Sequence, residues 1–386
     1  MSTIQVATSS ATSTQTATAD ILRQLAGRED ALLVVFFADH YDGAAMAKQL
    51  RAALPARTRV IGCSSAGEIG PAGYQKDSVV VLALPADEFT VATLLIENLA
   101  DLDMAAWRGA LERAMGDLAS QPASAQATGT FALTYIDGLS LREEAVGHAV
   151  QAFIGQVPLV GGSAGDGLHF VRTRVMHEDI ATDNAAVVAL VRTRRPFHAF
   201  KTQHFDRTDV RMVVTEARPA ERIVTEINGL PAAEEYARQA GVPLGDLDPM
   251  AFAAYPVLVR IGGTEHVRSI QKVNDDGSLS FYCAIEEGIV LTLADGKDPL
   301  ANLARSFDAF RDRVGQTEAV LACDCILRRL EFEQRGTAGD ISDFLEAHKV
   351  VGFSTYGELF RGVHVNQTFT AIAFGKSIVA GPDAGA

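Results

Sequence analysis

A short loop pattern occurs three times in the chain, and this repeat constrains the fold more than any other feature, because copies of one pattern are expected to adopt one local structure. The copies are residues 60–68, 159–166 and 351–358. Each starts at the end of an apolar run, continues as Gly-x-Ser, and ends in a second glycine followed by an acid. Counted from the first glycine to the acid, the middle copy is one residue shorter than the others.

Regular patterns extend the repeat on both sides of each loop. Residues spaced four apart, such as Met46, Leu50 and Leu54, predict a helix before the first loop. An apolar run ending in Asp precedes each helix, at 32–39, 131–137 and 319–324, and a further strand follows each loop, at 79–84, 186–191 and 368–374. The unit is therefore β-α-β, Gly-Ser loop, β, which predicts an α/β protein with mixed sheets and right-handed crossovers.

The repeat also suggests how the chain divides. Residues 1–19 are rich in Ser, Thr and Ala, and we expect a flexible tail there. Residues 20–196 hold two copies of the unit and form one α/β domain. Residues 197–379 form a second, which begins with a strand-rich segment containing a hairpin turn at Asn274–Gly277. A disordered tail is expected at 380–386.

Charge and composition exclude several classes of function. The chain has 386 residues, with 34 Lys and Arg against 48 Asp and Glu, a net charge of −14. An acidic chain without a basic stripe is unsuited to nucleic acid or to anionic membranes. No run approaches the roughly 18 apolar residues of a membrane helix. The first residues lack the basic start and apolar core of a signal peptide, and four cysteines are too few for a disulfide scaffold, so we expect a cytoplasmic protein.

The three loop serines, Ser64, Ser163 and Ser354, are candidate ligand-binding residues. Gly161–Gly165 also matches the Gly-x-Ser-x-Gly nucleophile elbow of hydrolases, which makes Ser163 a possible nucleophile. The other two loops are Gly-x-Ser-x-x-Gly, which is not an elbow. A tight turn whose serine bonds the backbone is the simpler interpretation.

Asp39, Asp137 and Asp324 end the first strand of each copy. Ligands of open α/β sheets bind beyond the carboxyl ends of strands, so these three are candidate ligand-binding residues. The alternative is that each caps the helix that follows.

Two of the nine histidines stand out. His204 lies in an aromatic-rich segment and His364 enters the last strand. An imidazole among apolar residues suits an axial haem ligand, although a lone histidine in a strand is more often a hydrogen-bonded structural residue.

The loop motifs, together with Asn228-Gly-x-Pro-Ala and Gly352-Phe-Ser-Thr-Tyr-Gly-Glu, resemble FIST proteins over roughly residues 25–380. These are bacterial sensory modules with tandem FIST N and FIST C domains. Cys-Asp-Cys-Ile-Leu-Arg-Arg at 323–329 and His-Val-Asn-Gln-Thr-Phe-Thr at 364–370 make the chain most similar to the NosP-type nitric-oxide-sensing haem proteins. This resemblance implies haem bound through a histidine, with His204 ahead of His364 as the iron ligand.

The resemblance also implies a non-enzymatic sensor that regulates a partner histidine kinase or cyclic-di-GMP enzyme, and a homo-oligomer is possible. Two alternatives stay open. One is a haem-free sensor that binds an amino acid or a similar metabolite, with Asp137 or Asp324 receiving the ammonium group. The other is a serine hydrolase acting through Ser163.

Overall fold

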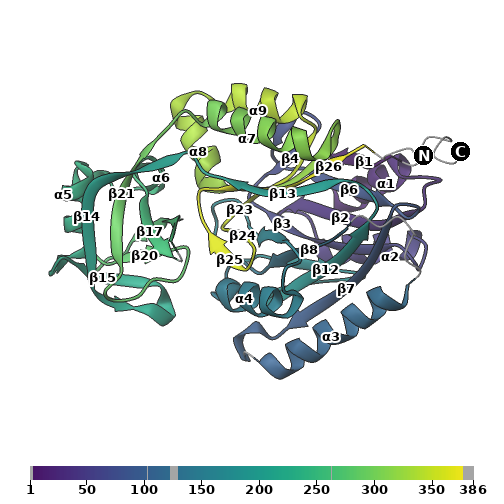
Figure 1. Cartoon of the computed structure of the whole chain (residues 1–386), viewed down its shortest axis with the longest axis horizontal. Coiled ribbons are helices and arrows are strands. Elements are labelled where there is room, and N and C mark those ends of the chain that lie inside the picture. Colours follow the sequence, from purple (N-terminus) through teal and green to yellow (C-terminus); the bar gives the residue numbers. More distant parts are fainter. Residues whose placement is uncertain (1–2, 102, 122–128, 262, 377–386) are drawn as a thin grey trace, which may run out of the picture.

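The computed structural model describes residues 3–101, 103–121, 129–261 and 263–376. It contains three α/β units that share one order of elements, and a strand-rich lobe (Figure 1). Each unit has an edge strand, a helix, a central strand, a crossover helix or helix pair, a second central strand, a hairpin and a return strand.

Unit 1 spans 5–85 and unit 2 spans 89–193. Unit 1 contains β1 (Gln5–Ser9), α1 (Thr14–Gln24), β2 (Asp30–Ala38), α2 (Gly43–Ala53), β3 (Arg59–Ser65), β4 (Glu68–Gly70), β5 (Gly73–Gln75) and β6 (Val79–Pro85). Unit 2 contains β7 (Phe89–Glu97), α3 (Met104–Ser120), β8 (Gly129–Ile136), α4 (Glu143–Ile154), β9 (Leu159–Ser163), β10 (Val175–His177), β11 (Ile180–Thr182) and β12 (Ala185–Thr193).

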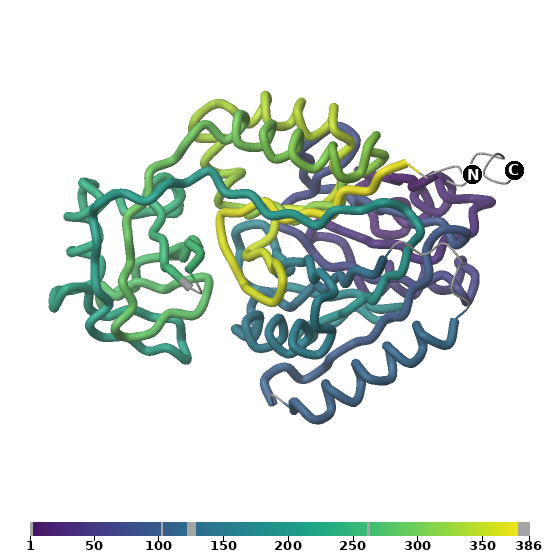
Figure 2. The backbone as a smooth tube through the Cα atoms, viewed as in Figure 1, coloured from purple at the N-terminus to yellow at the C-terminus, as the bar shows by residue number. Residues whose placement is uncertain are grey.

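Unit 3 begins at 197 and is interrupted by the lobe. Its elements are β13 (Phe197–Thr202), α7 (Pro299–Val314), β22 (Thr317–Cys325), α8 (Ile326–Arg335), α9 (Ala338–Ala347), β23 (Val350–Thr355), β24 (Glu358–Phe360), β25 (Val363–Val365) and β26 (Phe369–Gly375). The lobe, residues 205–296, is inserted between β13 and α7 and stands to one side of the three units (Figures 1 and 2).

The lobe is one sheet with two helices. Its elements are β14 (Phe205–Arg218), β15 (Ile223–Ile227), β16 (Leu230–Pro231), α5 (Ala232–Ala240), α6 (Pro249–Ala254), β17 (Val257–Ile261), β18 (Thr264–Arg268), β19 (Ile270–Val273), β20 (Leu279–Phe281) and β21 (Val290–Gly296). The predicted turn at Asn274–Gly277 is confirmed, because β19 and β20 pair antiparallel on either side of it.

Each unit completes its sheet with a hairpin that belongs to another unit. The β4–β5 hairpin of unit 1 pairs with β23 of unit 3, and the β24–β25 hairpin of unit 3 pairs with β9 of unit 2. The β10–β11 hairpin of unit 2 pairs with β3 of unit 1, which closes the cycle. Separate stretches of the chain thus depend on one another for backbone hydrogen bonds.

The inner faces of the three sheets form one shared core, while helices cover the outer faces (Figure 1). One ring from each unit meets there. The centroid of Phe36 lies 4.5 Å from that of Phe353 and 5.3 Å from that of Tyr135. On the outside, α1 and α2 cover unit 1, α3 and α4 cover unit 2, and α7 and α9 cover unit 3.

The first glycine of each repeated loop has one structural role. A Cβ atom on Gly62, Gly161 or Gly352 would lie 1.9, 1.8 or 1.8 Å from a carbonyl oxygen of the neighbouring parallel strand. Only glycine permits this approach of the two backbones. The glycine is therefore explained by packing in all three copies.

The predicted α/β class, with mixed sheets, two domains and a strand-rich central segment, is confirmed.

The flexible tail predicted at 1–19 is wrong. Residues 5–9 form β1, which pairs with β6 over five residues, and Ser13 caps α1. Its Ala and Thr side chains are small enough to pack closely, as Ala7 and Ala17 do when fully buried. Residues 380–386 lie outside the described residues. Among the described helices, none is both long and apolar enough to cross a bilayer.

Replacing Gly161 by alanine tests this role of the glycine. The added Cβ would overlap the carbonyl oxygen of Thr134. Overpacking of this kind costs about 1–3 kcal/mol or more, so we expect Gly161→Ala to lower the free energy of unfolding by at least that amount in urea denaturation.

The matched control is Gly116→Ala in α3, where a new Cβ meets nothing within 4 Å. Alanine is the better helix former, so this variant should gain about 0.5–1 kcal/mol. Equal stability of the two variants would contradict the close-approach explanation.

Candidate functional site

The strand register shows that the three candidate aspartates are not equivalent. Ser64, Ser163 and Ser354 stand opposite Phe37, Ile136 and Asp324 respectively. Asp324 therefore lies level with its serine, Asp137 one residue beyond this level and Asp39 two residues beyond it. A shift of one residue turns a side chain to the other face of a strand, so the shared sequence pattern does not produce three copies of one site.

The carboxylates of Asp137 and Asp324 are held by groups of the protein itself. Both residues are buried. Asp324 accepts from Arg328 Nε at 2.6 Å and from the Tyr74 hydroxyl. Asp137 accepts from the backbone N–H of Leu139 and Asn184 and from the Thr173 hydroxyl. Neither carboxylate is left for an ammonium group from a ligand.

The alternative that these aspartates cap the crossover helices is wrong. The N-cap of α2 is Asp42, whose carboxylate accepts from the N–H groups of Ala44 and Ala45. The N-cap residues of α4 and α8 are Arg142 and Cys325, and neither side chain makes a capping hydrogen bond.

Asp39 and Ser64, in contrast, line one cavity of ≈ 540 Å³. We call it the switch-point cavity, because it lies beyond the carboxyl ends of the adjacent parallel strands β2 and β3, where open α/β sheets bind ligands. Its lining comes from the end of β2, the start of α2, Ser64, and residues of the 166–174 loop: Phe37, Asp39, His40, Tyr41, Asp42, Ser64, Asp166, His169, Val171, Arg172 and Arg174.

The 166–174 loop is present in unit 2 alone. Val175 of unit 2 occupies the register position that Glu68 and Glu358 occupy in units 1 and 3. Units 1 and 3 reach this position after a single glycine, whereas unit 2 inserts residues 166–174. Asp166 holds the loop together by accepting from the N–H groups of residues 170, 171 and 172 at 2.7–2.8 Å.

The switch-point cavity is lined by both acidic and basic side chains. Asp39 belongs to unit 1, and its carboxylate lies 3.7 Å from His169 Nε2, with the two side chains 37% and 70% exposed. Arg172 and Arg174 come from the 166–174 loop. Arg172 Nε lies 3.9 Å from an exposed Asp183, and Arg174 Nη1 donates to the Ala181 carbonyl at 3.2 Å. Such a cavity can bind a small molecule that has both an ammonium and a carboxylate.

The loop also connects the cavity to the lobe. The Phe170 ring lies 4.7 Å from that of Tyr356 in unit 3 and 6.1 Å from that of Tyr282 in the lobe. The Tyr356 hydroxyl donates to Asp166 and accepts from its backbone N–H at 3.1 Å. Phe170 thus places the 166–174 loop in contact with both unit 3 and the lobe.

The loop serines are buried. Ser64 Oγ accepts from the Arg174 N–H at 2.9 Å, as expected for a serine that bonds the backbone. Ser163 Oγ and Ser354 Oγ have no hydrogen-bond partner among the described residues. A nucleophilic serine needs a base within hydrogen-bond reach, and the surroundings of Ser163 in the described part of the chain offer none.

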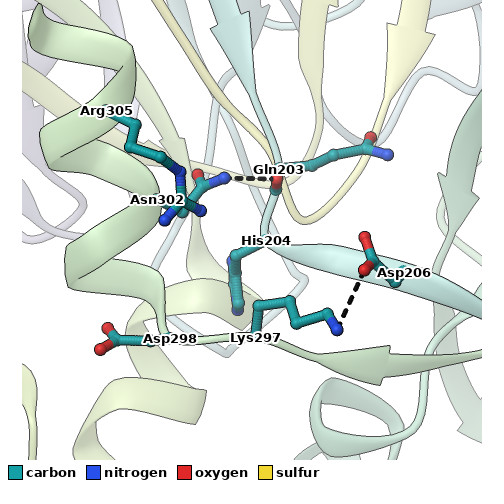
Figure 3. Close-up of a pocket in the computed structure, with 7 residues that line it drawn as sticks. All are labelled: Gln203, His204, Asp206, Lys297, Asp298, Asn302 and Arg305. Atoms are coloured by element: carbon teal, nitrogen blue, oxygen red, sulfur yellow. Dashed lines mark hydrogen bonds and ion pairs between the residues drawn. The ribbon is translucent and has the colours of Figure 1, made fainter.

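His204 lies at the junction between the units and the lobe, on the wall of a second cavity of ≈ 330 Å³ (Figure 3). Its side chain is fully buried, and both ring nitrogens have partners: Nδ1 faces Arg328 Nη1 at 2.8 Å and Nε2 faces Glu331 at 2.9 Å. A guanidinium can only donate, so Nδ1 accepts and the ring is the neutral tautomer with hydrogen on Nε2. Burial, assisted by Arg328, lowers the pKa of His204.

This junction cavity is lined mainly by polar and charged side chains, namely Gln203, Asp206, Lys297, Asp298, Asn302 and Arg305 besides His204 (Figure 3). Lys297 pairs with Asp206 at 3.0 Å. An axial haem ligand must offer a free ring nitrogen. His204 could do so only after breaking its bond to Arg328 or to Glu331.

His364 lies elsewhere, so the structure does not bring the two candidate iron ligands into one cavity. Its Nδ1 is 3.1 Å from Glu144, and its Nε2 has no partner among the described residues. Burial opposes the charge on Glu144, but His364 and Arg222 together lower the pKa of that carboxyl. Arg222, from the lobe, also contacts Glu143 at 2.6 Å, so this cluster ties the lobe to the start of α4.

All four cysteines are free and buried. Burial raises the pKa of each thiol, so none of them is activated as a thiolate. Within the described ranges, no three His, Cys, Asp or Glu side chains form a group that could hold a metal ion.

Sequence reasoning missed His169, Arg172 and Arg174, which complete the switch-point cavity. A signal for them exists. The interval from the second loop glycine to the return strand is longer in the middle copy (165 to 185) than in the first (67 to 79) or the third (357 to 369). Extra length in one copy of a repeat commonly marks a loop on the binding face.

Buried neutral His204 should make stability depend on pH. Its pKa is lowered in the folded state, so the unfolded chain takes up a proton first as the pH falls through about 6.5. The free energy of unfolding should therefore fall between pH 7 and pH 5. In His204→Gln this contribution is absent. Urea denaturation at several pH values should then show a smaller loss of the free energy of unfolding between pH 7 and pH 5.

The control is His148→Gln, a substitution on the exposed face of α4. It should keep the pH dependence of the wild-type chain. An unchanged pH dependence in His204→Gln would show that His204 is not buried as a neutral ring.

Comparison with known families agrees with this architecture. A FIST N domain model matches residues 31–230, and a FIST C domain model matches residues 232–361. The boundary between the two matches falls inside the lobe. No curated protein sequence matches the chain. FIST domains are sensory, ligand-binding domains of signal transduction rather than catalytic ones, and they typically act with partner signalling proteins. Units, loops and family matches together establish that this chain belongs to the FIST family, with a FIST N and a FIST C domain.

Proposed function

We propose that the chain is a sensor of an amino acid or a similar zwitterionic metabolite, which binds in the switch-point cavity. The observation that carries this proposal is that Asp39 lines the same cavity as Arg172 and Arg174. The cavity lies where α/β sheets bind ligands, and its cationic wall comes from a loop that the other two units lack.

Each part of such a ligand has a partner in the cavity. The ammonium group replaces His169 beside the Asp39 carboxylate, since that contact is long and exposed. The ligand carboxylate accepts from Arg172, whose contact with Asp183 is long and exposed, and from the remaining N–H groups of Arg174, which donates to the Ala181 carbonyl at 3.2 Å. The planar guanidinium fork matches a carboxylate. The neighbouring His40 and Tyr41 rings, 3.9 Å apart, cover part of the ligand side chain.

The signal then passes through the 166–174 loop. Closing of Arg172 and Arg174 onto the ligand moves the loop, and Phe170 transmits this movement to Tyr282 of the lobe. The ligand shifts the equilibrium between two positions of the lobe only by as much as its affinity differs between them. A partner histidine kinase or cyclic-di-GMP enzyme reads that change.

Thermal unfolding with a panel of amino acids tests this proposal. A bound ligand raises the melting temperature by mass action, so at least one amino acid should stabilise the wild-type chain. Asp39→Asn removes the charge that holds the ammonium group and should weaken binding about tenfold or more.

The matched control is Asp117→Asn on the exposed face of α3, which should respond as the wild type does. Stabilisation that survives unchanged in Asp39→Asn would place the ligand elsewhere. A panel with no effect on the wild-type chain would remove the proposal.

A haem-based nitric oxide sensor is the second candidate. It is supported by the resemblance to NosP-type proteins and by the position of His204 on the wall of the junction cavity. Haem would supply an iron that binds nitric oxide, and His204 would hold it after giving up one hydrogen bond. His364 is the alternative ligand.

The absorption spectrum after addition of haemin tests this second candidate. A sharp Soret band that shifts on reduction and again with nitric oxide is expected, and His204→Ala should lose it while His148→Ala keeps it. A spectrum equal to that of free haemin would exclude the haem hypothesis.

A further inference from the structure

The lobe sheet has one covered face and one open face. The covered face packs against α5 and α6, with Met212, Val214 and Leu291 buried there. Side chains alternate along a strand, so Arg211 and Val213 of β14 point to the other face. In the strand register Thr292 of β21 lies opposite both Arg211 and Leu258, and Arg260 follows Leu258 by two residues on the same face of β17. Arg211, Val213, Thr292 and Arg260 are not buried, whereas Leu258 is.

Three arginines from this open face line one shallow hollow of ≈ 250 Å³. They are Arg207 and Arg211 of β14 and Arg260 of β17. Among the described residues that line the hollow, the acid is Glu265, which lies 3.4 Å from Arg207 with both side chains partly exposed. Arg211 and Arg260 have no ion pair within the described part of the chain. Two of the three arginines are thus left without a paired acid among the described residues, in a chain whose net charge is −14.

Exposed apolar side chains border the arginines. Val213 and Val290 are opposite each other in the β14–β21 register and are 39% and 45% exposed. Arginine beside apolar side chains, with little lysine, is the composition of protein–protein contact surfaces rather than of ordinary surface. We call this surface, made of Arg207, Arg211, Val213, Arg260 and Val290, the arginine face.

We propose that the arginine face is the docking surface for an acidic segment of the signalling partner. Carboxylates of such a segment accept bidentate hydrogen bonds from the arginine forks. An apolar side chain of the segment covers Val213 and Val290. A nucleic acid is a poorer match, because the strongly acidic chain repels a polyanion and the hollow lacks lysine and aromatic side chains for phosphates and bases.

The position of the arginine face suits an output surface. It belongs to the sheet that also contains β20 and β15. Tyr282 follows β20 and contacts the 166–174 loop, and Arg222 precedes β15 and contacts α4. A shift of the lobe therefore moves the arginine face relative to the three units. The docking surface rests on the proposed sensor function only because a sensor requires a signalling partner. It holds whether the ligand is an amino acid or haem.

Fluorescence anisotropy with a labelled short peptide of glutamate and leucine tests the docking surface. The full-length chain should bind this probe, with affinity falling as salt rises, and should bind the glutamine–leucine version of the peptide more weakly. The triple variant Arg207→Gln, Arg211→Gln, Arg260→Gln should lose about tenfold in affinity. Unchanged circular dichroism and melting temperature would show that this variant is folded.

A matched control removes three exposed arginines elsewhere: Arg108→Gln and Arg113→Gln on α3 and Arg313→Gln on α7. This control should bind the acidic peptide as the wild type does. Equal loss in both triple variants, or no binding by the wild type, would overturn the proposal. Stronger competition by pyrophosphate than by the peptide would instead identify a small-anion site, and a salt-sensitive dimer that is lost in the first triple variant would identify a second copy as the occupant.

The amino-acid stabilisation experiment separates this proposal from the sensor function. The triple variant of the arginine face should retain any stabilisation by the ligand, because Asp39, Arg172 and Arg174 are unchanged. Loss of peptide binding with retained stabilisation would support both proposals, whereas loss of both would contradict an independent docking surface.

Discussion

The exchange of hairpins among the three units is the constraint on which the rest of the structure depends. β4–β5, β24–β25 and β10–β11 each complete the sheet of a different unit. The loops that lead into these hairpins therefore meet one another. The backbone N–H groups of Ala66, Ser163 and Gly165 donate to the carbonyl oxygens of Ser354, Gly357 and Ser64, respectively. Within each unit, Gly62, Gly161 and Gly352 let the strand that leads into its loop approach the neighbouring parallel strand closely, which explains why the repeated motif begins with glycine.

Departures from the threefold pattern, rather than the pattern itself, build the functional features. The 166–174 loop in unit 2 supplies the cationic wall of the switch-point cavity. The lobe inserted into unit 3 places Tyr282 next to that loop. In unit 3 the strand-end carboxylate of Asp324 is neutralised internally by Arg328, whereas Asp39 of unit 1 is 37% exposed and faces the cavity. The three strand-end aspartates thus differ in exposure: Asp137 and Asp324 are buried, whereas Asp39 lines a cavity.

Much of the fold could be predicted from the sequence, because the repeat fixes the order of strands and helices and the periodicity of Met46, Leu50 and Leu54 identifies a crossover helix. The hairpin exchange could not be predicted, since β4, β10 and β24 have three residues each and pair with strands far away in the sequence. The same limit applies to the site. The sequence identified Asp39 and Ser64 as candidates. It could not show that Asp137 and Asp324 stand at different registers, because these depend on strand pairing. Nor could it show that Arg172 and Arg174 reach the cavity, because this depends on the fold.

Hydrogen–deuterium exchange with a stabilising amino acid tests the central claim most directly, namely that the switch-point cavity binds the ligand and passes the signal to the lobe. The account predicts slower exchange in the 166–174 loop and at the start of α2, together with a change around Tyr282. Protection confined to residues 203–206 and 297–305, which surround the junction cavity, would contradict it and would move the ligand to the neighbourhood of His204.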